Sequence, residues 1–464
     1  MPTSSPFSDF LSAVAQRGRS IIGIGSTTNA ELSSMDVISL CHKLLSSNGE
    51  ASGIALSFEI LQRYQLLDQE ERLKFFLALY QQFAADATVV EQAAKNYLDD
   101  PSLENLGALS HSVEPPRRKL IIRLNQAPNA TLLLINMRAD LLEMLPDSIE
   151  LKEVDRDFAT LFASWFNGGF LQLRSLDWTS PAEMLEKLMR YEAVHGMAGW
   201  SDLRERIAPQ DRLIYGFFHP RLGNEPLIFI EVALMKEMPS EIGSILEPDA
   251  PALDPASVRT AVFYSISNCQ KGLRGIPLGS FLIKQVVEDL KKSFPDLKEF
   301  VTLSPVPGFA SWLKILVTDQ SGENSELRLP AKSKESLLKI IDGEWSSDQA
   351  SIEPLKSVIS SAAAHYLSAE KDSQNKPIDP VAKFHLGNGA RLERINWPSD
   401  SSENGLNSSF GLMVNYFYHL NEIEKNHELF VRTGEVKVSS EVSALAKSFD
   451  KAANPTNITD RSLV

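Results

Sequence analysis

Two side chains in the second half of the sequence could carry out acid–base chemistry. Ser304 ends an apolar run in VTLSPVPGFASWL, where two prolines stiffen the turn that follows. His385 precedes a glycine-containing turn in FHLGNGARLERINW. A histidine with its ordinary pKa of about 6.5 can give up a proton at neutral pH, and a serine hydroxyl can orient it. Taken alone, each residue is more commonly a turn serine or a structural histidine.

A glycine-rich loop could bind a phosphate. In TAVFYSISNCQKGLRGIPLGSFLIKQVV, a strand-like run leads into a loop with Gly272, Gly275 and Gly279, and a helix begins near Ser280. Glycines let backbone N–H groups turn inward, and a helix N-terminus adds partial positive charge, so a pyrophosphate could lie there. Positive side chains add to this on an otherwise acidic chain, namely Lys271, Arg274 and Lys284. A glycine-rich connection that binds nothing is the open alternative.

Charge and composition exclude several functions. The 46 Lys and Arg against 60 Asp and Glu give a net charge of −14, which argues against a general nucleic-acid binder or a protein of anionic membrane surfaces. Two cysteines, Cys41 and Cys269, are too few for a disulfide scaffold, and the eight histidines lack metal-ligand spacing. We therefore expect no metal and a reducing compartment. Without a signal peptide or a long apolar run, we expect a cytoplasmic location.

The elements from about residue 33 to 167 are predicted to be helices. In DQEERLKFFLALYQQF, Asp68 can cap a helix while Glu71 reaches back to it, as in a capping box. Pro115 and Pro116 predict a break followed by a helix start. Apolar residues recur at helical spacing on one face, namely Leu73, Phe76, Leu77, Tyr80 and Phe83. Repeated stripes of this kind predict a bundle of amphipathic helices.

After Gly168 and Gly169 the pattern changes to short strands. FLQLRSL, RLIYGFFH, PLIFIEVALM and TAVFYSIS are rich in aromatic and β-branched residues, and turn-forming clusters separate them. The helical run GSFLIKQVVEDLKKSF and the strand KEFVTLS come next, which predicts a βαβ unit behind a mainly antiparallel meander. The sequence thus predicts a helical domain followed by an α/β domain.

Several long segments, in this order, resemble the malonyl-CoA decarboxylase family. They are SWFNGGFLQLRSLDWTSP, YEAVHGMAGWSDLRERI, NEPLIFIEVAL, SISNCQKGLRGIPLGSFLIKQVV, LSPVPGFASWL, FHLGNGARLERINW and GLMVNYFYHL, and they cover about residues 160–440. The resemblance implies a helical domain over residues 1–160 that is used in self-association. Because the apolar stripes offer more surface than one core absorbs, we expect a homodimer or a homotetramer built from dimers, with contacts through residues 33–167. It also implies a GNAT-like (acetyltransferase-type) catalytic α/β domain that binds malonyl-CoA over residues 161–464. No catalytic residue is then expected in the helical domain.

The same resemblance implies the residues of the site. Ser304 and His385 are implied to be the catalytic pair, and Tyr418 to line the pocket. Relatives can carry a glutamate where this chain has Pro277, so no carboxylate role is assigned at that position. The loop implied to hold the coenzyme A part of the substrate comprises Arg274, Gly275, Ile276, Pro277, Leu278, Gly279 and Ser280.

The implied reaction converts malonyl-CoA to acetyl-CoA and CO₂. Loss of CO₂ leaves a thioester enolate, which needs hydrogen-bond donors already in place and a proton at C2. His385 is expected to donate that proton, while Ser304 either binds the departing carboxylate or holds the histidine tautomer. The thioester carbonyl is itself the electron sink, so neither metal nor biotin is expected, and coenzyme A enters only as part of the substrate.

Two other functions are compatible with these segments. An acyl-CoA N-acyltransferase would share the fold, but it would need an amine-acceptor channel and would release free coenzyme A. A non-catalytic scaffold that senses coenzyme A would bind acyl-CoA without turnover.

The C-terminal sequence RSLV lacks the S-K-L targeting signal of peroxisomal relatives, which favours a bacterial-type cytoplasmic enzyme.

Overall fold

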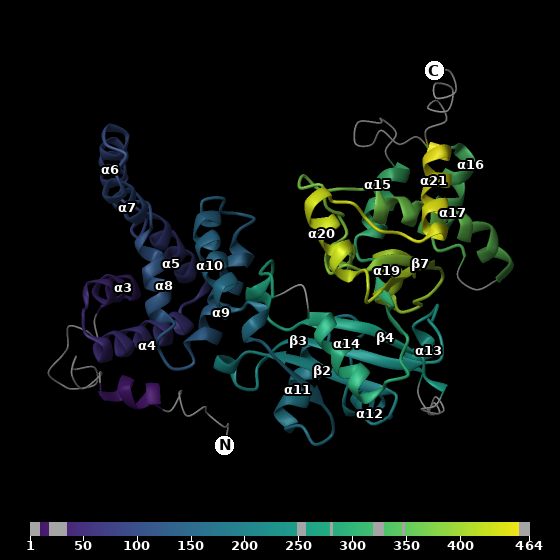
Figure 1. Ribbon diagram of the computed structural model, residues 1–464, viewed down its shortest axis with the longest axis horizontal. Helices are drawn as coiled ribbons and strands as arrows, with labels where there is room; N and C mark the ends of the chain where they lie inside the picture. The colour runs from purple at the N-terminus through teal and green to yellow at the C-terminus, as the bar shows by residue number, and fades with distance from the viewer. Residues whose placement is uncertain are drawn as a thin grey trace. The chain divides into compact units, whose positions relative to one another are not determined.

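A computed structural model describes the chain over residues 10–17, 35–247, 257–278, 282–318, 329–345 and 349–453. The chain divides into two units (Figure 1). The first unit consists of Met1–Gln172, Phe217–Ile228 and Asn268–Gly279. The second consists of Leu173–Gly216, Phe229–Ser267 and Ser280–Val464. Two short segments from the later part of the chain, one of which contains most of the glycine loop, therefore belong with the helical first unit.

The first unit is built from helices. After a helix over residues 10–17, they are α3 (Val37–Ser46), α4 (Glu50–Leu66), α5 (Gln69–Gln81), α6 (Ala87–Asp99), α7 (Leu103–Ser112), α8 (Pro116–Leu124), α9 (Ala130–Met144) and α10 (Leu151–Trp165). Three short 3-10 helices also belong to this unit: η1 (Gly168–Phe170), η2 (Pro220–Leu222) and η4 (Lys271–Leu273). The predicted helix start after the paired prolines is confirmed, because α8 begins at Pro116.

Helix α5 begins as the sequence predicts. The Asp68 side chain accepts a hydrogen bond from the Glu71 N–H at 2.9 Å, and the Glu71 side chain accepts one from the Asp68 N–H at 3.0 Å. The capping box is therefore confirmed.

The apolar stripe predicted for this helix is only partly right. Phe76 and Phe83 are buried, but three of the predicted residues are only half-buried, namely Leu73, Leu77 and Tyr80. Phe75 and Leu79 are buried instead. Helix α5 packs against α3, α9 and α10 at once, so its buried surface is wider than a single stripe.

Helices α6 and α7 pack against each other as a hairpin and bury little apolar surface (Figure 1). Ala93 is the one buried residue of α6, and none of the ten residues of α7 is buried. Large apolar side chains on this hairpin are exposed instead, namely Val89, Leu98, Leu103, Leu106 and Val113.

The second unit is organised around a sheet of eight strands. They are β1 (Gln172–Leu176), β2 (Arg212–Phe218), β3 (Pro226–Met235), β4 (Thr260–Asn268), β5 (Glu299–Thr302), β6 (Ser304–Pro305), β7 (Arg391–Asn396) and β8 (Met413–Phe417). The strand order is β1-β2-β3-β4-β5-β8-β6, and β7 also pairs with β8. The ends of β2, β3 and β4 fall in segments that group with the first unit.

The predicted βαβ unit is confirmed. Helix α14 (Leu282–Ser293) connects β4 to β5, and these strands are parallel, with Thr260 opposite Glu299 and Phe263 opposite Thr302. Strand β8 returns antiparallel beside β5, β6 and β7. Strand β5 thereby lies beside the carboxyl end of β8, where Val301 pairs with Phe417. The short β6 lies beside the start of β8, where Ser304 pairs with Val414.

The other helices of this unit are α11 (Ala182–Tyr191), α12 (Trp200–Ile207), α13 (Gly243–Leu246), α15 (Phe309–Thr318), α16 (Ala331–Ile341), α17 (Gln349–Ser368), α18 (Pro380–Gly387), α19 (Glu403–Ser409), α20 (Ile423–Thr433) and α21 (Ser440–Ala453). Helices α17 and α21 lie side by side (Figure 1). Among the helices that the structure describes, none combines the length and hydropathy needed to span a bilayer.

Candidate active site

Ser304 and His385 are brought together by two elements of the second unit. Ser304 begins β6, where it pairs with Val414 of β8, and His385 lies in the last turn of α18. The Ser304 Oγ lies 3.2 Å from the His385 Nε2. The other ring nitrogen, Nδ1, lies 2.8 Å from the hydroxyl oxygen of Tyr418, the residue that follows β8. The three side chains therefore form one continuous hydrogen-bonded cluster.

The hydrogen bonds of this cluster fix the tautomer of the histidine. The Ser304 hydroxyl donates to the Thr302 Oγ1 at 2.8 Å. Because a serine hydroxyl has one hydrogen, its oxygen accepts from His385, and Nε2 carries the ring hydrogen. Nδ1 is then an acceptor, and the Tyr418 hydroxyl donates to it. Each of these groups therefore donates to the next one. Tyr418 donates to His385, His385 donates to Ser304, and Ser304 donates to Thr302.

Burial sets the protonation states of the cluster. The exposed fractions of Ser304, His385 and Tyr418 are 5%, 3% and 2%. Loss of hydration lowers the pKa of His385 to about 3 and raises the pKa of Tyr418 well above its usual value. The imidazole is therefore neutral at pH 7 and the phenol is protonated. This finding corrects the expectation that His385 titrates near its ordinary pKa.

Asp379 caps the helix that carries His385. Its Oδ1 accepts hydrogen bonds from the N–H groups of Val381 and Ala382, at 3.0 Å and 2.9 Å. Pro380 at the first helical position favours the helical backbone there. The start of α18, and with it the position of His385 two turns later, is fixed by this buried carboxylate.

The same carboxylate also holds the turn that follows Ser304. Its Oδ2 accepts a hydrogen bond from the Gly308 N–H at 3.4 Å, and the hydroxyl of Tyr366 on α17 donates to the same carboxylate. A Cβ at Gly308 would collide with the Tyr366 hydroxyl, so the turn closes this tightly only with glycine. Asp379 thereby ties together the two segments that carry the predicted pair.

Sequence analysis missed three members of this cluster: Thr302, Tyr416 and Asp379. The Tyr416 ring stacks on the His385 imidazole, with ring centroids 4.7 Å apart and an interplanar angle of 23°. Its backbone N–H donates to the Thr302 Oγ1 at 3.1 Å. Strand alternation could have found two of them, because each precedes a predicted site residue by two positions. The Asp-Pro pair that begins α18 was a signal for the third.

The glycine loop is shaped by contacts within the first unit. Gly272 packs against α9, where a Cβ would collide with the backbone oxygen of Ile135. Gly275 has a φ of +79°, in the left-handed region that favours glycine. Arg138 of α9 donates to the backbone oxygens of Gly272 and Arg274, at 2.6 Å and 3.0 Å. The conformation of the loop is therefore set by backbone geometry and by one arginine that sequence analysis did not single out.

The residues predicted to bind coenzyme A differ in exposure. Arg274, Gly275 and Pro277 are exposed, Leu278 is half-buried and Ile276 is buried. Gly279 and Ser280 lie outside the described residues. Lys271 is also exposed, whereas Lys284 forms an ion pair with Glu424 that offsets part of its charge.

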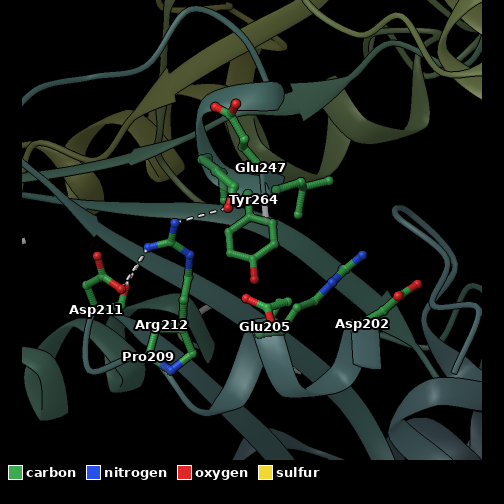
Figure 2. Close-up of a pocket in the computed structure, with 10 residues that line it drawn as sticks. Asp202, Glu205, Pro209, Asp211, Arg212, Glu247 and Tyr264 are labelled. Atoms are coloured by element: carbon green, nitrogen blue, oxygen red, sulfur yellow. Dashed lines mark hydrogen bonds and ion pairs between the residues drawn. The ribbon is translucent and has the colours of Figure 1, made fainter. Parts of the chain in front are cut away.

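The second unit also contains a pocket that no predicted site residue lines. This pocket of about 290 Å³ lies beside Tyr264, where Arg212 is held by Asp211 and by a backbone oxygen (Figure 2). Tyr264 packs with Leu303, whose side chain points to the face of the sheet opposite Ser304. Among the described residues, no group of three or more His, Cys, Asp or Glu side chains is placed to hold a metal ion.

Comparisons with known proteins cover most of the chain. The family model for the malonyl-CoA decarboxylase C-terminal domain matches residues 169–456, and the model for the N-terminal domain of the same family matches residues 83–166. The mitochondrial malonyl-CoA decarboxylase of Anser anser anser is 35% identical over 85% of this chain and 84% of its own length. The corresponding protein of Rattus norvegicus is 36% identical over 74% of this chain and 73% of its own length.

Solved structures give the same result. The crystal structure of malonyl-CoA decarboxylase from Rhodopseudomonas palustris is similar with a TM-score of 0.84 and 46% identity, over 88% of this chain and 98% of that one. The structure from Agrobacterium vitis has a TM-score of 0.83 and 48% identity, over 89% of this chain and 99% of that one.

Proposed function

The chain belongs to the malonyl-CoA decarboxylase family, and we propose that Tyr418, His385 and Ser304 carry out its reaction, the conversion of malonyl-CoA to acetyl-CoA and CO₂. The activity is that of a carboxy-lyase. The predicted order of the domains is confirmed: a helical N-terminal domain precedes an α/β domain. The GNAT-like arrangement of the α/β domain is part of the proposal. The observation that carries the proposed residue roles is the single direction of the hydrogen bonds through the buried cluster.

Breaking the bond between C2 and the carboxylate requires an electron sink and a site from which water is excluded. When the bond between C2 and the carboxylate breaks, its electron pair moves into the thioester, and the carbonyl becomes an enolate oxygen. The breaking bond must stand perpendicular to the thioester plane for this overlap. Burial favours the step, because the localised charge of the carboxylate spreads over the enolate as CO₂ leaves uncharged, and hydrogen bonds to the enolate are stronger away from water.

Proton delivery to C2 follows from the tautomer. The His385 Nε2 gives its hydrogen to C2, and Nδ1 takes the hydroxyl hydrogen of Tyr418, so the ring stays neutral throughout. The enolate is a much stronger base than either group, which drives both transfers. Solvent then returns a proton to Nε2, and Nδ1 gives its hydrogen back to the Tyr418 oxygen, which restores the starting tautomer. Ser304 holds the ring in the required tautomer, which is the second of the two roles considered for it.

One experiment tests the proposed activity directly. Purified protein is mixed with malonyl-CoA without added cofactor, and acetyl-CoA is followed over time. We expect turnover that EDTA and avidin do not change, because the substrate carries its own electron sink. Release of free coenzyme A in the presence of an amine would instead indicate an N-acyltransferase, and binding without turnover would indicate a sensing scaffold.

The loop over residues 274–280 is proposed to hold the phosphates of coenzyme A. The left-handed backbone at Gly275 and the exposed charge of Arg274 support this assignment. The two bonds from Arg138 keep the loop in shape without using its N–H groups. The N–H groups of Arg274 and Ile276 already donate to backbone oxygens of η4, so the exposed side chain of Arg274 would supply much of the grip on the phosphates.

The α6–α7 hairpin is proposed to be a contact between copies of this chain, in a homodimer or a homotetramer. Leu98 and Leu103 are 79% and 88% exposed, and the hairpin has little apolar core of its own. A second copy would cover these side chains, and two-fold symmetry is the commonest arrangement.

Light scattering of the full chain tests this contact. Replacing both Leu98 and Leu103 with Asp should give a monomer at micromolar concentration. Ile315→Asp, at an exposed apolar position of α15, is the matched control and should leave the oligomer intact. A wild-type monomer, or an assembled double variant, would contradict the assignment.

A cytoplasmic location is proposed as well. The bacterial proteins above are 46% and 48% identical to this chain, against 35% and 36% for the two mitochondrial ones. Cys41 and Cys269 are buried thiols, which suits a reducing compartment. Fractionation of the source cells, with the activity measured in each fraction, is the test.

A further inference from the structure

One polar group in the catalytic cluster has no partner. The hydroxyl of Tyr416 is fully buried and makes no hydrogen bond to any residue that the structure describes. We propose that this hydroxyl contacts the substrate and donates a hydrogen bond to the thioester carbonyl oxygen, and then to the enolate that replaces it. The proposal rests on the decarboxylase function and assigns one further residue to it.

Tyr416 is held rigidly beside the reacting groups. It lies on β8 two residues before Tyr418, and its backbone N–H is bonded to the Thr302 hydroxyl oxygen. Its ring stacks on the His385 imidazole at 4.7 Å. The phenol oxygen therefore cannot swing away to find a partner elsewhere, and leaving a buried hydroxyl unpaired costs about 1–3 kcal/mol. A ligand that accepts a hydrogen bond would remove that penalty.

The hydroxyl is able to donate and not merely to accept. Burial raises the pKa of Tyr416 well above its usual value, and the nearby Asp379 carboxylate adds to the shift. The phenol is therefore protonated at neutral pH. A neutral donor suits an oxygen that gains charge during the reaction.

The other hydrogens of the cluster already have acceptors. The Ser304 hydrogen goes to Thr302, the Tyr418 hydrogen goes to the His385 Nδ1, and the Nε2 hydrogen is the proton delivered to C2. None of these three is available to stabilise the enolate oxygen. The Tyr416 hydroxyl is a donor in the same cluster that is not committed to another residue of the described chain.

The enolate oxygen is a better acceptor for this hydroxyl than the carboxylate. Negative charge leaves the carboxylate and develops on the thioester oxygen as the bond breaks. A donor on the carboxylate would stabilise the substrate more than the transition state, whereas a donor on the thioester oxygen does the opposite. Contact with the thioester oxygen therefore predicts an effect on kcat, while contact with the carboxylate predicts an effect on KM.

The test is Tyr416→Phe, which keeps the stacked ring and removes the oxygen. We expect kcat for malonyl-CoA to fall roughly 100-fold or more, the usual effect of losing one oxyanion donor, with KM within about threefold of wild type. Thermal stability without substrate should be unchanged or higher, because no hydrogen bond is lost. Tyr215→Phe is the matched control: that buried hydroxyl is bonded to Asp289, so its loss should lower stability and leave kcat unchanged.

A carbonyl-free analogue separates the possible outcomes. An analogue of malonyl-CoA with a methylene in place of the thioester carbonyl should inhibit wild type and Tyr416→Phe equally. Weaker inhibition of the variant, a raised KM with unchanged kcat, wild-type kinetics, or a destabilised variant would each overturn the proposal. If the wild type forms no acetyl-CoA at all, the proposed function itself has failed, and that result is seen before any variant is made.

Discussion

The Ser304–His385 cluster and the glycine loop lie at opposite extremes of burial. In the cluster the side chains are almost completely buried, and their hydrogen bonds fix both orientation and protonation. In the loop Arg274 and Gly275 are exposed, and shape depends on backbone conformation and on the bonds from Arg138. The comparison indicates that the chemical step depends on buried side-chain hydrogen bonds, whereas substrate binding depends on the conformation and charge of an exposed loop. Substitutions should therefore separate into effects on kcat and effects on KM.

The largest effect is expected from the predicted pair. Ser304→Ala and His385→Asn should each lower kcat about 100-fold or more, because the donor of the C2 proton or the group that orients it is lost. KM should change little. Steady-state kinetics with malonyl-CoA give both values, and near wild-type turnover by both variants would remove the pair from the mechanism.

A smaller loss of kcat is expected from Tyr418→Phe. Without the hydroxyl, Nδ1 has no proton to take as Nε2 gives one up, although the rest of the cluster is intact. We expect kcat to fall by about tenfold to 100-fold, within the range of a general acid–base contribution. If kcat is unchanged while Ser304→Ala is inactive, the imidazole must obtain its proton by another route.

Acid should weaken the fold through the buried histidine. Folded His385 stays neutral down to about pH 3, whereas in the unfolded chain its pKa is about 6.5. Between these values the unfolded state binds a proton that the folded state does not, so stability falls as the pH drops below about 6.5. From pH 7 to pH 5 this residue alone should remove about 2 kcal/mol from the free energy of unfolding.

Denaturant unfolding at the two pH values measures this loss. His385→Asn should lose less stability than wild type over the same interval, because its side chain does not titrate. An equal loss in both proteins would mean that the imidazole is already hydrated or charged in the folded state.

A change of KM without a change of kcat is expected from the loop. Gly275→Ala has space for the new methyl group but a backbone φ of +79°, which disfavours alanine by about 1–2 kcal/mol. KM for malonyl-CoA should rise about fivefold or more. Gly107→Ala on α7 also has open space, has no positive φ and should behave as wild type. A fall in kcat for Gly275→Ala would contradict the expectation that the loop controls KM and the cluster controls kcat.

The smallest effect is expected at Lys284. Its ammonium group is paired with Glu424 at the surface, so less of its charge is available to a phosphate. Lys284→Gln should change KM by no more than about twofold, less than Arg274→Gln in the same assay. The reverse order would move the phosphate contact from the loop to the start of α14.

Much of the fold and the central pair of the site could be predicted from the sequence. The capping box at Asp68 and the start of α8 depend on neighbours within a few residues, so local patterns are sufficient for these. The βαβ unit follows from the order strand, helix, strand, although its two strands pair across 39 positions. The prediction of buried residues on α5 was only partly right, because burial depends on how many helices pack around α5. The expectation of an ordinary pKa for His385 was wrong for a related reason, since no local pattern shows that a histidine will be fully enclosed.

Local patterns could mark the partners of the pair as candidates, but they could not show which residues those partners contact. Thr302 and Tyr416 differ from many other strand residues only in the strand that happens to lie opposite them. Asp379 accepts a hydrogen bond from Gly308, which lies 71 residues earlier in the chain. Neither local sequence predicts that the two segments are in contact. Long-range register, and not residue type, selects these side chains.

The bonds that Arg138 makes limit how the protein can be recombined. This buried arginine lies in the stretch matched by the N-terminal family model, and the loop carbonyls that it binds lie in the stretch matched by the C-terminal model. Its charge is balanced by Asp155, at 2.8 Å. A chimera that takes its two halves from different relatives therefore inherits this arginine from one parent and its acceptors from the other. Sequence boundaries between the two family models are thus poor crossover points, and viable hybrids should keep α9 and the glycine loop from the same parent.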